Sequence, residues 1–176
     1  FRDILNAAGL DHTCKDTVTE ALGMQVHYDT HRHTLTLLHE VYLERLFHAV
    51  DPGNHIPLRS IPICPNVVKQ STKSDCPLCH DFDKVRYALF RKKLGSIAHV
   101  ANWSRPDLAF AVSFVSQFMA NPGDKHMHMV DYILGYLKNT RTLKITFKQS
   151  RNKVVLLGLS DSDLGECSVP SRATLR

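Results

Sequence analysis

The sequence predicts an α+β fold: a β-hairpin plus helix, a proline-rich linker, three packed helices and a terminal β-hairpin. Two patterns carry this prediction. Between positions 91 and 140, apolar residues recur every three or four positions in three successive segments, which is typical of amphipathic helices. In residues 22–28, and again in residues 143–147, apolar and polar residues alternate, which is typical of half-buried strands.

The first hairpin is expected within residues 22–38. The alternating segment 22–28 and the second strand candidate 33–38 are separated by residues 29–32, a plausible four-residue turn. Residues 39–50 then place apolar side chains on one helical face, and the following Asp-Pro-Gly ends that helix.

A linker is expected in residues 51–83. Its prolines remove backbone donors and disfavour both helices and central strands. Those that carry the argument are Pro57, Pro62, Pro65 and Pro77. We therefore expect an extended segment that crosses the surface.

The helical region should begin near Asp83. Its second helix is expected to be capped by the hydroxyl of Ser104, with Pro106 and Asp107 in the first turn. Residues 121–124 (NPGD) stop this helix and start the third one. After Thr140 the apolar period changes from 3.6 to 2, and the apolar run 153–159 follows, so a second hairpin is expected there.

Composition is that of a soluble globular protein, with 43% hydrophobic and 22% charged residues in 176. No apolar run approaches the ~20 residues that span a bilayer, so we expect no membrane partner. Five cysteines at irregular spacing fit a reducing compartment. We therefore expect an intracellular location, in the cytoplasm, the nucleus or both.

Basic residues are concentrated in two places. The net charge is +5, and residues 132–160 contain no Asp or Glu. The side chains expected to contact phosphates are Arg91, Lys92, Lys93, Lys138 and Arg141. Such a face suits a nucleic acid, and the alternative is a solvated surface that only confers solubility.

Two motifs have the residue types of metal sites. Cys76-Pro-Leu-Cys79-His80 matches the spacing of covalent haem attachment, or of a zinc site with a fourth ligand such as Cys64. Incidental linker cysteines are the favoured interpretation, so no metal is assigned. The carboxylate Asp161 follows an apolar strand and is of the type that binds Mg²⁺, although a strand-ending turn explains it as well.

Several blocks together resemble the Pol polyprotein of copia-type retrotransposons. They are residues 22–26 (LGMQV), 94–97 (LGSI), 104–112 (SRPDLAFAV), 133–140 (ILGYLKNT) and 158–163 (GLSDSD). They occur in the family's order and near its spacings over residues 17–166. The chain is similar to the region from the end of the reverse transcriptase palm, through the thumb, to the start of RNase H.

This resemblance implies the following organisation. Residues 1–50 would end the palm, 51–83 would be the linker, 84–140 would be thumb-like helices, and 141–176 would begin a truncated RNase H whose sheet is incomplete. The hairpin would be similar to a primer grip, with the residues Leu22, Gly23, Met24 and Gln25. Asp161 would correspond to the first RNase H carboxylate.

The parent family is an RNA-directed DNA polymerase with RNase H, and its cofactor is Mg²⁺. This chain lacks the family's polymerase aspartates and later RNase H carboxylates. We therefore expect no cofactor and no catalysis from this chain alone. The expected partners are an RNA–DNA or DNA duplex and the rest of the Pol polyprotein. Alternatives are a structural or protein-interaction module without a nucleic-acid role and, least favoured, a metal- or haem-binding module.

Overall fold

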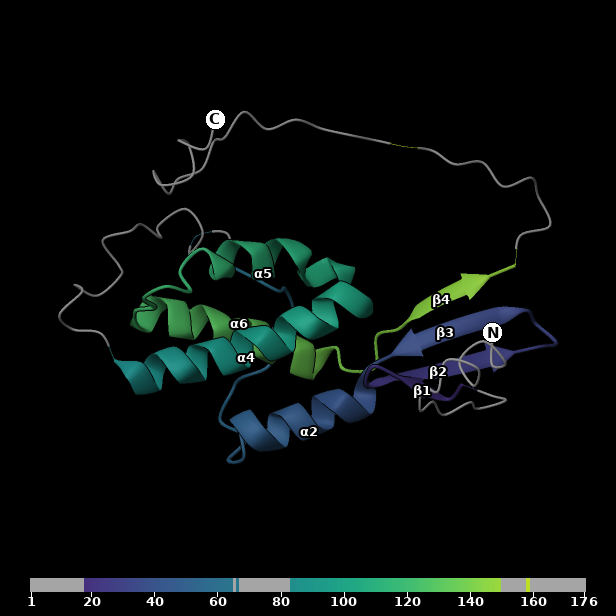
Figure 1. Ribbon diagram of the computed structural model, residues 1–176, viewed down its shortest axis with the longest axis horizontal. Helices are drawn as coiled ribbons and strands as arrows, with labels where there is room; N and C mark the ends of the chain where they lie inside the picture. The colour runs from purple at the N-terminus through teal and green to yellow at the C-terminus, as the bar shows by residue number, and fades with distance from the viewer. Residues whose placement is uncertain (1–17, 65, 67–82, 150–157, 159–176) are drawn as a thin grey trace, which may run out of the picture.

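The computed structural model describes residues 18–64, 66, 83–149 and 158, and it confirms the predicted α+β class (Figure 1). In chain order the elements are β1 (Glu20–Ala21), β2 (Met24–Asp29), β3 (Thr34–Leu38), α2 (Glu40–Val50), α4 (Lys84–Trp103), the 3-10 helix η3 (Pro106–Leu108), α5 (Ala109–Ser116), α6 (Asp124–Asn139) and β4 (Ile145–Lys148). No helix in these ranges has the length and apolarity needed to cross a membrane.

The strands form one antiparallel sheet in the order β1-β2-β3-β4. The predicted first hairpin is confirmed, with Tyr28 opposite Leu35 across β2 and β3. Strand β4 extends this sheet, because Ile145 pairs with Leu37 of β3. The sequence predicted a partner for β4 in residues 153–159, all of which except Gly158 lie outside the described residues. A strand expected to begin a separate unit therefore completes the sheet of the hairpin (Figure 1).

One hydrophobic core joins α2 to the three later helices. Its fully buried members include Leu43, Phe90, Leu94, Ile97, Leu108, Val115, Ile133, Leu134 and Leu137. Helix α4 contacts both α5 and α6, and α2 contacts both α6 and β2 (Figure 1). The hairpin is thereby attached to the helical layer through α2, which follows β3 after a single residue, His39.

The start of the helical region is predicted correctly, but one predicted cap is wrong. The carboxylate of Asp83 accepts hydrogen bonds from the backbone N–H groups of Val85 and Arg86 and so caps α4. Ser104 does not cap the next helix, because it is the C-terminal cap of α4 and Arg105 precedes η3. The Ser104 hydroxyl is buried, and the ring of His39 is its hydrogen-bond partner.

The described part of the linker packs along α6. The backbone N–H of Arg59 donates to the carbonyl oxygen of Gly135 over 3.2 Å, and Asn139 Nδ2 donates to the Arg59 carbonyl over 3.0 Å. Gly135 permits this close approach, because a Cβ there would lie closer than 3.0 Å to the carbonyl oxygen of Pro57. The described residues of the linker thus lie along α6.

Candidate nucleic-acid interface

The turn between β1 and β2 is a two-residue hairpin turn in which both residues have positive φ. Leu22 has φ 53° and Gly23 has φ 77°, as the twist of adjacent antiparallel strands favours. Leucine is an unusual residue for this conformation, and its side chain is 59% exposed. The turn therefore presents an apolar side chain to the surface at the cost of backbone strain.

Side chains of α2 and α4 contact this turn on the side that faces the helices. His99 Nε2 lies 3.0 Å from the carbonyl oxygen of Leu22, and because a carbonyl only accepts, this nitrogen donates the proton. A Cβ at Gly23 would stand 3.4 Å from the ring of Tyr42. The rings of Tyr42 and His99 are 5.2 Å apart. The turn is thus seated on an aromatic platform that belongs to the helices.

Beneath the platform lies His39, which is 1% exposed. Its Nδ1 is 2.5 Å from the Ser104 hydroxyl, and its ring meets those of Tyr42 and His99 edge-on. Burial and then the neighbouring His99 lower the pKa of His39 from 6.5 to about 4, although the backbone of Leu22 opposes this shift. His39 is therefore neutral at physiological pH and links α2 to the end of α4.

The four residues expected to resemble a primer grip have different environments. Leu22 and Gly23 form the turn, whereas Met24 is 6% exposed and faces inward. The side-chain oxygen of Gln25 accepts a hydrogen bond from the backbone N–H of Val41. Leu22 and Gly23 therefore offer the surface, while Met24 and Gln25 hold the hairpin against α2.

The five basic residues expected to contact phosphates do not form one free patch. Lys93 is buried and pairs with Asp131 over 2.6 Å. Lys138 pairs with the buried Asp51 over 2.8 Å. Each of these two lysines is paired with a carboxylate of the protein, which limits its availability to a phosphate.

The other three basic residues are exposed. Arg91 and Lys92 lie on the outer surface of α4, and the Arg91 guanidinium donates to the hydroxyl of Tyr87 over 3.0 Å. Arg141 follows α6 and is 3.9 Å from Glu44, with both side chains about half exposed. Such an exposed pair is weak, so these three cations remain able to contact a polyanion.

The lowered pKa of Asp51 reflects its hydrogen bond and ion pair with Lys138. Burial alone would raise the pKa of Asp51, but hydrogen bonds from Lys138 and from the backbone of His55 and Ile56 outweigh it, so the pKa lies below its usual value. Lys138 also donates to the carbonyl oxygen of Ile56. The pair therefore fastens the end of α6 to the start of the linker.

The most distinctive sequence block, SRPD, forms a structural junction. Arg105 is 2% exposed and donates to both carboxylate oxygens of Asp107 at 3.0 and 2.8 Å. It also donates to the carbonyl and hydroxyl oxygens of Thr140 at 2.9 and 2.8 Å. The Tyr136 hydroxyl donates to Asp107 over 2.8 Å. The block therefore joins the α4–α5 connection to the end of α6, a role that the predicted cap did not anticipate.

The ionic state of this junction follows from its contacts. Burial would raise the pKa of Asp107, but hydrogen bonds from Arg105 and then Tyr136 lower it below its usual value. Burial and the hydrogen bond to Asp107 raise the pKa of Tyr136. Asp107 is thus held as a carboxylate and Tyr136 as a neutral phenol.

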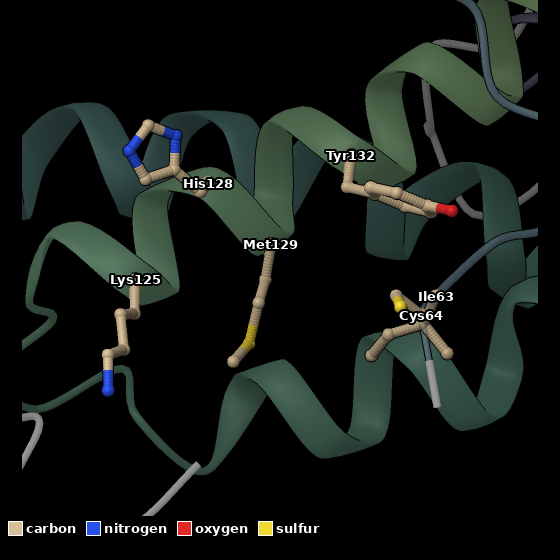
Figure 2. Close-up of a pocket in the computed structure, with 6 residues that line it drawn as sticks. All are labelled: Ile63, Cys64, Lys125, His128, Met129 and Tyr132. Atoms are coloured by element: carbon tan, nitrogen blue, oxygen red, sulfur yellow. The ribbon is translucent and has the colours of Figure 1, made fainter. Parts of the chain in front are cut away.

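The remaining candidates supply no metal centre among the described residues, which contain no group of three or more potential ligands. Cys76, Cys79, His80 and Asp161 lie outside those residues. Cys64 lies at a small pocket of about 100 Å³ between α6 and the linker, together with Met129 (Figure 2). This pocket is mostly apolar.

Comparison with known proteins shows relatives among transposon polyproteins. The chain is 31% identical over 149 residues to a retrovirus-related Pol polyprotein from transposon TNT 1-94 of Nicotiana tabacum, and this match covers 82% of the chain. It is 36% identical over 74 residues, 42% of the chain, to a retrovirus-related Pol polyprotein from transposon RE1 of Arabidopsis thaliana. A stretch of 70 residues, 40% of the chain, is 36% identical to secreted RxLR effector protein 161 of Plasmopara viticola.

The chain spans only part of each relative: 11% of the tobacco polyprotein, 5% of the Arabidopsis polyprotein and 49% of the Plasmopara protein. No protein-family model matches it, and no solved structure matches it significantly. The chain is therefore related to retrotransposon Pol polyproteins, and the activity of those longer proteins is not transferred by similarity alone.

Proposed function

We propose that this chain is the part of a reverse transcriptase/RNase H polyprotein that contacts the template–primer duplex, and that it has no catalytic activity alone. The hairpin and α2 end the palm in this proposal, α4 to α6 are the thumb-like helices, and residues 141–176 begin RNase H. Two observations support this proposal: the order of the matching sequence blocks and one feature of the structure.

That feature is the place along α4 at which the β1–β2 turn contacts this helix. His99, which holds the Leu22 carbonyl, lies seven residues after Lys92. Seven residues are close to two helical turns, so the two side chains share one side of the helix, about 10 Å apart along its axis. The turn and an exposed cation therefore face the same side of α4, with Arg91 beside them. A duplex backbone on this side would meet both.

Binding to an RNA–DNA hybrid, followed by fluorescence anisotropy at several salt concentrations, tests the proposal. Each neutralised phosphate contributes about 0.9 to the slope of log affinity against log salt. We expect Arg91→Ala combined with Lys92→Ala to weaken binding and to reduce that slope by about 2. Lys138 is unsuitable for this test, because its loss would leave Asp51 buried without its cation.

Arg32→Ala combined with Arg45→Ala is the matched control. Both side chains are exposed, on the β2–β3 loop and on α2, and the control removes the same charge. We expect a smaller loss of affinity from this pair. Equal losses in the two variants, or wild-type binding with no salt dependence, would contradict the proposed interface.

A second candidate, a protein-interaction module, is favoured by the sheet. Tyr28 and Phe147 are 62% and 55% exposed, and the strand register places both beside Leu35 on one face. The rest of the Pol polyprotein is the partner that this candidate requires. A folded chain that fails to bind the hybrid at low salt would favour it over the proposal.

A further inference from the structure

A second cavity, with several polar side chains in its lining, lies between the linker and α6, away from the β1–β2 turn. Its volume is about 360 Å³, within the range of small-ligand pockets. The residues that line it are His55, Ile56, Pro57, Arg59, His128, Asp131 and Tyr132. None of them belongs to the interface proposed above.

Arg59 is the preorganised cation of this cavity. Both of its backbone polar groups are bonded to α6, through Gly135 and Asn139. Its guanidinium carbon lies 4.7 Å from the centre of the Tyr132 ring, a cation–π contact. Its Nε is buried without a hydrogen-bond partner among the described residues. No carboxylate in those residues forms an ion pair with it, so the side chain is held in place while its Nε–H donor stays without a partner.

The other polar groups of the cavity leave a positive balance. Asp131 is the lining carboxylate, and Lys93 neutralises it through a 2.6 Å ion pair. His55 and His128 add imidazole groups that can donate N–H bonds. His128 and Tyr132 are four residues apart on α6, and both line this cavity.

We propose that this cavity binds a phosphate group, either of a nucleotide or of a nucleic-acid backbone. A guanidinium presents its donors in a planar fork that matches two oxygens of a phosphate. The cation–π contact with Tyr132 restricts the movement of that fork. An acidic ligand in this cavity meets the Arg59 side chain, whose Nε–H donor the protein leaves without a partner.

Nuclear magnetic resonance of the ¹⁵N-labelled full chain tests this site. Inorganic phosphate, a 5′-phosphorylated thymidine dinucleotide and the RNA–DNA hybrid are titrated separately. The Nε–H signal of Arg59 is followed in the wild type, and the backbone amide signals of His128 and Tyr132, which line the cavity, are followed in the wild type and in every variant. We expect at least one of the first two probes to shift the Arg59 signal saturably. Arg59→Ala should weaken the binding of that probe roughly tenfold, as the loss of a charge-assisted hydrogen-bond pair implies.

Two further variants separate charge from geometry. Arg59→Lys keeps the charge but loses the fork, so we expect it to recover only part of the affinity. Arg45→Ala removes an exposed cation from α2 and should leave binding of the small probes unchanged. Thermal unfolding of each variant shows that the fold is intact, which we expect for Arg59→Ala because the linker is fastened by backbone groups.

The outcomes identify the source of the phosphate. A shift with inorganic phosphate supports a site for free phosphate or a terminal phosphate, whereas a shift with the dinucleotide alone supports a site for nucleotides. Competition by the hybrid assigns the site to a nucleic-acid backbone. If neither small probe shifts the Arg59 signal, or if Arg59→Ala binds as tightly as the wild type, the proposal is wrong. That result would leave the salt test of Arg91 and Lys92 unaffected.

Discussion

Gly135 lies in the interior of α6, where substitution by alanine should normally stabilise a helix. Gly135→Ala should instead destabilise this protein. The added Cβ would lie closer than 3.0 Å to the carbonyl oxygen of Pro57 and 3.1 Å from Cγ of Arg59. Because the nearest obstacle is backbone, the linker has to move away from the helix. The substitution therefore tests whether the linker packs on α6 as the structure shows.

The size of the effect follows from what that movement breaks. Besides the Lys138–Asp51 pair, three hydrogen bonds join residues 56–59 of the linker to α6: Arg59 N–H to Gly135, Asn139 to the Arg59 carbonyl, and Lys138 to the Ile56 carbonyl. Each contributes about 1 kcal/mol to the free energy of unfolding. Alanine returns about 1 kcal/mol through its helix propensity. We therefore expect a net destabilisation of about 2 kcal/mol, which lowers the melting temperature by about 4–8 °C.

Gly95→Ala is the matched control, because Gly95 also lies inside a helix and a Cβ there would meet nothing within 4 Å. We expect it to stabilise the protein by about 0.5–1 kcal/mol. Urea unfolding followed by circular dichroism measures both variants against the wild type. If Gly135→Ala is as stable as Gly95→Ala, the linker does not pack against α6 as described, and the cavity between the linker and α6 does not form.

Two further predictions concern the buried polar groups. Arg105→Lys keeps the charge but has three donors and no planar fork, so it cannot reproduce the four hydrogen bonds to Asp107 and Thr140. We expect a loss of about 2 kcal/mol in the free energy of unfolding, measured in urea. A loss below about 0.5 kcal/mol would contradict the junction. Because the folded-state pKa of His39 is about 4 and its usual value is 6.5, the unfolded chain binds the proton first as pH falls, and stability should decline between pH 6.5 and about 4. His39→Gln should reduce that decline, and an unchanged pH profile would refute this assignment.

Local patterns in the sequence predicted most of the elements, but not the short strand β1 or the turn at Leu22 and Gly23, which the alternation had placed inside a strand. The hairpin, α2 and the three later helices all appear, and the carboxylate of Asp83 caps α4 near the predicted start. Periodicity and capping depend on residues within a few positions of each other, so they can be recognised without knowledge of the fold. The order of the matching blocks likewise predicted the relationship to retrotransposon Pol polyproteins.

The partners of the polar side chains depended on the tertiary structure. Lys138 was predicted to contact phosphate, yet it pairs with Asp51, 87 residues earlier in the chain. Ser104 was predicted as a cap, yet its hydroxyl meets His39, 65 residues away. A charge or hydroxyl acts on whatever the fold brings within about 3 Å, and sequence spacing does not encode that distance. The sequence therefore determined which elements form, whereas the packing decided which of their polar groups remain free to bind a ligand.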